Sequence, residues 1–244
     1  MPALIRWWTQ DLAEISPTAF PDAVFAAGAD LLARWGEPHR HYHGTQHLVE
    51  MFWALEELEL ADAIDAREAT LGRIAAWLHD AIYDPTAVSG ANEADSAALA
   101  RQVLSDLECD DADVAAVEAL VLATATHSEP SDETFGDALA AADDERAEPP
   151  AVSAALWDAF HDADLWIFSA PATRFDDYCA EVRAEYAHVP DPAYRAARGE
   201  ILRGFATRPH IYRTAHARQE WEPTAQSNLA RELARLAPAP VDVT

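Results

Sequence analysis

Apolar residues recur three and four positions apart along most of this chain, which is the spacing of one face of an α-helix. Leu71, Ile74 and Leu78 form one such stripe, and Pro85 ends it because proline cannot continue a helix. Helices are predicted over residues 19–35, 47–58, 67–82, 92–107, 111–125, 151–168, 172–187, 191–207 and 223–236. No segment alternates as a β-strand does, so the sequence predicts an all-α fold.

The length of 244 residues fits one large domain, and we predict a single-domain helical bundle over residues 1–244. The residues able to carry chemistry concentrate between residues 40 and 165, and the helices over 172–236 complete the fold. Residues 128–150 lack helical periodicity, are acidic and are bounded by prolines. We interpret this segment as an acidic surface insertion.

The formal net charge of −26 excludes two classes of partner. A chain this acidic repels phosphate polyanions, so we expect neither general nucleic-acid binding nor binding to an anionic membrane. No apolar run is long enough to span a bilayer, and early acidic residues argue against a signal peptide. Cys109 and Cys179 lack metal or redox spacing. These features predict a cytoplasmic protein, whose oligomeric state the sequence leaves open.

Histidines crowd into the segment RHYHGTQH, which leads into a predicted helix. His47 lies at the start of that helix, and His43 lies on the loop before it, where we expect it to line a substrate pocket. The pair His79 and Asp80 ends another helix, and two aspartates follow within 161–164. Imidazole nitrogens and carboxylate oxygens are typical ligands of divalent metals. These residues predict a metal site that activates water and neutralises charge on a phosphate.

Six segments carry a resemblance to a known family: RHYHGTQH (40–47), AWLHDAIYDP (76–85), NEADSA (92–97), TH (126–127), DADL (162–165) and EPTAQSNL (222–229). In this order they resemble the HD-domain superfamily of metal-dependent phosphohydrolases. The chain is more closely similar to a bacterial group of predicted HD phosphohydrolases. The resemblance covers most of the chain and implies an all-helical core of the HD-domain type.

The resemblance also implies which residues bind the metal, namely His47, His79, Asp80 and Asp164. Asp162 is the alternative to Asp164, which we prefer because the last aspartate of the superfamily typically precedes an apolar residue, as in Ala-Asp-Leu. His161 would then be a coincidental second His-Asp pair that faces solvent. The divalent ion could be Mn, Fe, Zn, Ni, Co or Mg. One ion is expected rather than two, since only His127 matches the additional histidines of two-metal members.

Related enzymes carry a catalytic glutamate three residues after the aspartate of the His-Asp pair, and here that position is Tyr83. The next residue, Asp84, becomes the candidate general acid or base, and Glu93 is the reserve. Each also has a structural interpretation. Asp84 could end the helix before Pro85, and Glu93 could complement the dipole of its own helix.

Six arginines and one acid occur between residues 195 and 218, an uneven placement in so acidic a chain. Because arginine binds phosphate through paired hydrogen bonds, we expect Arg198, and also Arg40 and Arg213, to bind an anionic substrate. His127 is expected to bond the substrate phosphate or to cap its helix.

These residues predict a metal-dependent phosphohydrolase that acts on a small phosphorylated molecule, with a nucleotide favoured. Phosphomonoester and pyrophosphate cleavage both stay open. The departure at Tyr83 supports an alternative, a catalytically degenerate HD domain that binds a nucleotide or a metal as a sensor. A helical scaffold whose histidines are only structural is a third hypothesis.

Overall fold

A computed structural model describes residues 2–126 and 152–237, and all regular structure in these ranges is helical. The all-α prediction is therefore confirmed. The elements are α1 (Pro2–Ile15), α2 (Pro21–Arg34), α3 (Thr45–Leu60), α4 (Ala66–His79), α5 (Ala91–Asp106), α6 (Asp111–Ala123), α8 (Ala154–Asp164), the 3-10 turn η1 (Trp166–Ser169), α9 (Ala172–Glu185), α10 (Asp191–Ala206), α11 (Ala215–Glu220) and α12 (Glu222–Leu236). The predicted insertion at 128–150 and His127 lie outside the described residues.

The structure adds two helices, α1 and α11, that were not predicted. Leu4, Trp8 and Leu12 of α1 are buried and lie four residues apart, so its apolar stripe is present in the sequence. The helix predicted over 151–168 is shorter, because α8 ends at Asp164 and η1 follows. These changes at helix ends matter, since the residues expected to carry chemistry lie there.

Helix α4 is central to the fold. Asp65 begins it with a capping box, in which its carboxylate accepts from the backbone N–H of Glu68 and the Glu68 side chain accepts in return. From Thr70 onward the helix is almost entirely buried, and Trp77 packs edge-on against Trp8. The Nε1 of Trp35 also donates to the Trp77 carbonyl. The carboxyl end of α4 is thus held inside the protein.

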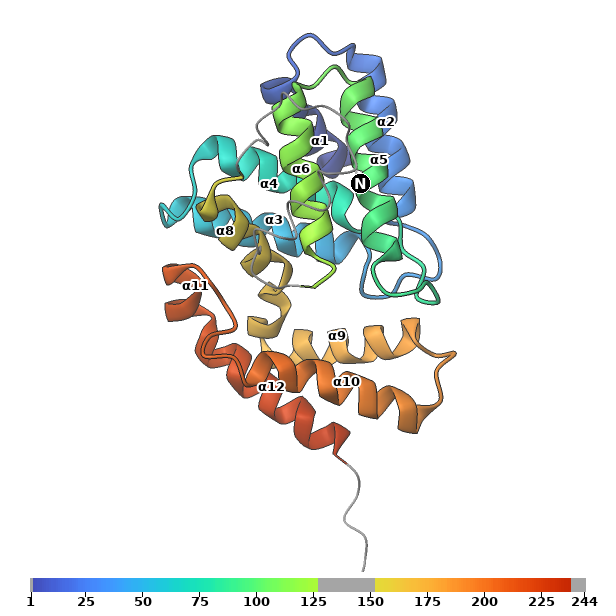
Figure 1. The fold of residues 1–244 in the computed structure, drawn as a ribbon, viewed down its shortest axis with the longest axis vertical. Coiled ribbons are helices and arrows are strands. Elements are labelled where there is room, and N and C mark those ends of the chain that lie inside the picture. Colours follow the sequence, from blue (N-terminus) through green and yellow to red (C-terminus); the bar gives the residue numbers. More distant parts are fainter. Residues whose placement is uncertain (1, 127–151, 238–244) are drawn as a thin grey trace, which may run out of the picture.

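The helices form two groups (Figure 1). Helices α1 to α6 and α8 pack together, while α9, α10 and α12 form a second layer that α8 and η1 connect to the first. Arg174 of α9 joins the layers through an ion pair with Glu50 of α3. Asn228 of α12 secures the connection by donating to the carbonyls of Phe168 and Ala170. Among the described residues, no helix is long and apolar enough to cross a membrane.

Candidate functional site

Three distant segments bring polar side chains to one point. His47 lies in the first turn of α3, and both it and His79, the last residue of α4, are buried. Asp80 follows with φ −113° and ψ 23°, so the backbone leaves the helical conformation there. This break lets neighbouring residues His79 and Asp80 face the same point, which an ideal helix would prevent. Asp164, the last residue of α8, completes the group.

The distances among these side chains fit a shared cation. His47 Nε2 lies 3.3 Å from both His79 Nε2 and Asp164 Oδ1. Asp80 Oδ2 lies 3.0 Å from His79 Nε2 and 4.0 Å from His47 Nε2. Ligand atoms about 2.1 Å from one ion are separated by roughly 3–4 Å in tetrahedral and octahedral geometry. The nitrogens of His47 and His79 and a carboxylate oxygen of Asp164 thus lie where a single divalent ion could bind them, and Asp80 lies next to this group, in contact with His79.

Hydrogen bonds behind the two histidines orient them for this purpose. His79 Nδ1 lies 2.9 Å from the Ala76 carbonyl, which can only accept, so Nδ1 carries a proton and Nε2 is the nitrogen that faces the cluster. His47 Nδ1 lies 3.0 Å from the hydroxyl of Tyr42. Such outer contacts are typical of histidines that bind metals, because they fix both the ring and its tautomer.

The charges of the cluster favour a cation. Burial lowers the pKa of His79, but the carboxylates of Asp80 and Asp164 raise it more, and the pKa ends well above its usual value. Burial raises the pKa of Asp80, yet His79 and other nearby histidines lower it more, and it ends well below its usual value. The concentration of negative charge that holds a proton on His79 also attracts a divalent ion.

The structure distinguishes Asp164 from Asp162. Asp162 is fully buried away from the cluster, and its two oxygens accept the backbone N–H groups of Arg213 and Thr214 at 2.8 Å. Its role is to hold the segment that leads into α11. The prediction that His161 faces solvent is wrong, because this segment covers α8 and leaves His161 buried beside Asp162.

A cavity of about 520 Å³ opens over the cluster, a volume within the range of small-molecule sites. His47, His79, Asp80 and Asp164 form its polar end, and His43 and Glu93 also line the cavity. Apolar and aromatic side chains of α9, of its C-cap Tyr186 and of α10 line the other end, among them Tyr194 and Ile201. The cavity therefore offers a charged end and an apolar end to one ligand.

Comparison of the chain with protein-family models, curated proteins and solved structures gives no match. The geometry and chemistry of the site therefore carry the functional argument.

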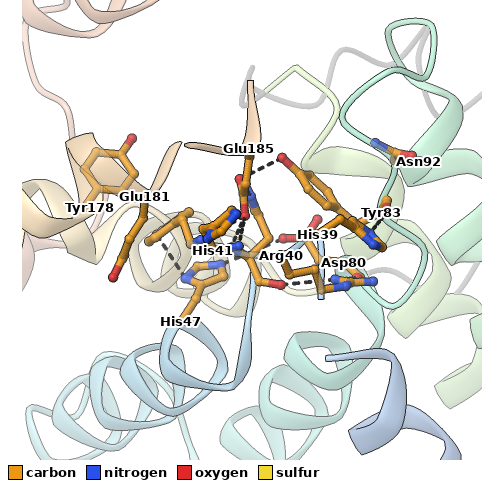
Figure 2. Close-up of polar contacts among 12 residues, drawn as sticks. His39, Arg40, His41, His47, Asp80, Tyr83, Asn92, Tyr178, Glu181 and Glu185 are labelled. Atoms are coloured by element: carbon orange, nitrogen blue, oxygen red, sulfur yellow. Dashed lines mark hydrogen bonds and ion pairs between the residues drawn. The ribbon is translucent and has the colours of Figure 1, made fainter. Parts of the chain in front are cut away.

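Arg40 does not line the cavity. Its guanidinium donates to the carbonyls of His43, Asp80 and Ala81 at 2.7–3.1 Å, and its side chain is 1% exposed. These bonds tie the histidine-rich loop to the turn after α4 (Figure 2). The prediction that Arg40 binds substrate is wrong, because its donors stabilise the backbone around the cluster instead.

The two candidates for proton transfer differ in whether they line the cavity. Asp84 is exposed, lies outside the cavity lining, and accepts from the backbone N–H and hydroxyl of Thr86. It stabilises the turn, and its prediction as a general acid or base is wrong. Glu93, in the first turn of α5, does line the cavity. Gly90 is the N-cap of α5, and the amide of Asn92 hydrogen-bonds the backbone of Asp84.

The arginines of the segment 195–218 lie at different places in the fold. Arg198 lines the cavity and donates to the hydroxyl of Tyr178. Arg213 lines a small neighbouring cavity that Asp164 also borders. Arg195 instead donates to backbone carbonyls near the end of α12, and Arg218 to the carbonyl of Tyr212.

One residue of the site was not predicted at all. Glu185, the last residue of α9, is buried, and its carboxylate accepts five hydrogen bonds. Oε1 accepts the backbone N–H groups of His41, Tyr42 and His43 at 2.8–2.9 Å. Oε2 accepts from His43 Nδ1 at 2.7 Å and from the hydroxyl of Tyr83 at 2.9 Å. A carboxylate at a helix C-terminus is unfavourable for the helix dipole, and this was the available signal.

These contacts predict a pH dependence of stability. Burial raises the pKa of Glu185, but hydrogen bonds and positive charge from His43 lower it more, to about 2 from 4.5. Because the folded pKa lies below the unfolded one, the stabilisation is complete above pH 4.5 and is lost as pH falls toward 2. Wild type should exceed Glu185→Gln in free energy of unfolding by on the order of 3 kcal/mol near pH 6. Urea unfolding from pH 7 to 3 measures this, and a constant difference would contradict it.

Proposed function

We propose that this protein is a metal-dependent phosphohydrolase of the HD-domain type, acting on a small phosphorylated molecule, with a nucleotide as the favoured class. The observation that carries the proposal is the convergence of His47, His79, Asp80 and Asp164 at the charged end of a cavity that Arg198 also lines. Two imidazoles and two carboxylates suit a divalent transition metal or Mg²⁺. The apolar and aromatic end of the cavity supports a substrate with an organic group such as a nucleobase.

A divalent ion in this cluster supplies a water of lowered pKa and neutralises charge on the phosphate. The protein's own residues bind the substrate and transfer the proton. Arg198 binds the phosphate oxygens from the α10 side, and His43 contacts the substrate from the loop side. Glu93, a carboxylate on the cavity wall, accepts or donates the proton during hydrolysis.

Substitution of Glu93 tests its role in proton transfer. Glu93→Gln is expected to lower kcat by about 100-fold, because a positioned general acid or base contributes on this scale. Asp84→Asn is the matched control, since Asp84 is a nearby carboxylate that does not line the cavity, and kcat of this variant should change less than about threefold. Steady-state kinetics on both variants measure kcat. A larger loss of kcat in Asp84→Asn than in Glu93→Gln would show that Asp84, and not Glu93, transfers the proton.

Substitution of Arg198 tests phosphate binding. Arg198→Ala is expected to raise KM by roughly 30-fold, which corresponds to the loss of charge-assisted hydrogen bonds. Arg195→Ala, one turn earlier on α10, removes an arginine that bonds only backbone carbonyls among the described residues and should leave KM within about twofold. An unchanged KM in Arg198→Ala would place the phosphate elsewhere.

The proposal as a whole is tested by elemental analysis of the purified protein followed by a hydrolysis screen on the same sample. The panel should contain nucleoside monophosphates, nucleoside triphosphates, alarmone-type pyrophosphates and sugar phosphates. We expect bound divalent metal and release of phosphate or pyrophosphate from a nucleotide. Thermal stabilisation by a nucleotide without any turnover would instead favour the sensor alternative.

A further inference from the structure

Glu185 does not line the cavity, but it contacts residues that do. Its side chain is fully buried, and it is not part of the cavity lining. The two side chains that donate to it, those of His43 and Tyr83, both line the cavity. Figure 2 shows Glu185 between Tyr83 and the loop that carries His41. One carboxylate from α9 therefore contacts two side chains that face the substrate.

The contacts of Glu185 fix the orientation and the tautomer of the His43 ring. A carboxylate only accepts hydrogen bonds, so the 2.7 Å contact places a proton on His43 Nδ1. Because Nδ1 donates to Glu185, Nε2 is the ring nitrogen of His43 that remains available to a ligand in the cavity. The ring of Tyr83 stacks on that of His43 with centroids 4.2 Å apart, and its hydroxyl is held by the same carboxylate. Orientation, tautomer and stacking of His43 thus depend on one residue.

We propose that Glu185 is a positioning residue: it holds His43 with Nδ1 protonated and Nε2 turned toward the substrate, and it holds Tyr83 against that ring. The effect of Glu185 on catalysis rests on the proposed function, whereas its effect on the protonation of His43 Nδ1 does not. Burial with five satisfied donors makes this carboxylate rigid, and a rigid partner is what a substrate-contacting histidine needs.

Glu185→Gln separates positioning of the side chains from support of the backbone. The three backbone N–H groups are fixed donors, so they should keep the amide oxygen of glutamine on their side. The amide NH₂ then replaces Oε2 and faces His43 Nδ1, which must give up its proton to accept. The hydroxyl of Tyr83 can rotate and accept instead. The variant therefore moves the proton of neutral His43 from Nδ1 to Nε2 while the loop keeps its anchor.

The first measurement is the ¹⁵N NMR spectrum of the histidine rings in the purified protein near neutral pH, with His43→Ala used for assignment. Wild type should show a protonated Nδ1 for His43, and Glu185→Gln an unprotonated one. Glu181→Gln is the matched control, because Glu181 lies one turn earlier on α9 and bonds Arg174 instead. Its spectrum should match wild type. An unchanged His43 signal in Glu185→Gln would overturn the proposal.

The second measurement is a double-mutant cycle on the substrate that wild type hydrolyses. Glu185→Gln should lower kcat/KM by about 10- to 100-fold, as loss of an outer-contact residue does. In the His43→Ala/Tyr83→Phe background the same substitution should cost less than about threefold, because the residues it acts through are gone. An equal loss in both backgrounds would show that Glu185 supports only the fold, against the proposal. If wild type hydrolyses nothing, the proposed function fails, and the NMR result alone still decides the role of Glu185.

Discussion

Asp164→Asn is expected to abolish metal binding and to lower the hydrolysis rate by about a thousandfold, which corresponds to loss of several kcal/mol of transition-state stabilisation. Asp164 supplies the carboxylate from α8, and its Oδ1 lies 3.3 Å from His47 Nε2 and 3.6 Å from His79 Nε2. A neutral amide is a weak ligand and cannot offset the charge of a divalent ion. Elemental analysis and steady-state kinetics on the variant measure both effects.

Asp162→Asn is the control for this experiment, because it changes the same functional group two residues earlier on α8. Asp162 accepts two backbone N–H groups and does not face the cluster, so this variant should keep its metal. We expect it instead to lose about 2–3 kcal/mol of unfolding free energy, since hydrogen bonds to a buried charge weaken. Metal loss in Asp162→Asn with retention in Asp164→Asn would contradict the assignment of the site.

The sequence predicted that His47, His79 and Asp164 share one site because the order of the motifs resembles that of a known family. His47 in the first turn of α3 and His79 at the end of α4 also lie near helix ends that turns and prolines mark in sequence, whereas the end of α8 at Asp164 was not predicted. The choice of Asp164 over Asp162 came from the family resemblance, and the geometry agrees with it. Local pattern and motif order were enough for these residues.

Residues that act through long-range contacts were not predictable in this way. Glu185 is 142 positions from His43, and nothing in the local sequence states that its carboxylate meets that loop. Arg40 and Asp84 have the residue types expected of functional groups. In the fold, however, Arg40 donates to backbone carbonyls, and the carboxylate of Asp84 accepts from Thr86 within a tight turn. Side-chain direction depends on the packed fold, which helical periodicity does not specify.

Chelation of the bound metal is expected to lower the melting temperature by about 10 °C. A ligand present at 1,000 times its Kd stabilises the folded state by about 4 kcal/mol, and each kcal/mol is worth roughly 2–4 °C in a domain of this size. Asp80 Oδ2 and Asp164 Oδ1 lie 3.0 Å and 3.6 Å from His79 Nε2, so both carboxylates would face a cation bound to that nitrogen. Differential scanning calorimetry with EDTA and with added Zn²⁺ or Mn²⁺ measures the shift. Asp164→Asn should show almost none.

The size of this shift should also depend on pH. The carboxylates of the cluster raise the pKa of His79 well above its usual value, so a proton competes with the metal for Nε2. Because the metal-loaded state binds fewer protons than the metal-free state, metal affinity increases as pH rises. The difference in melting temperature with and without EDTA should therefore be larger at pH 8 than at pH 6. An equal or smaller difference at pH 8 would mean that His79 Nε2 is not a metal ligand.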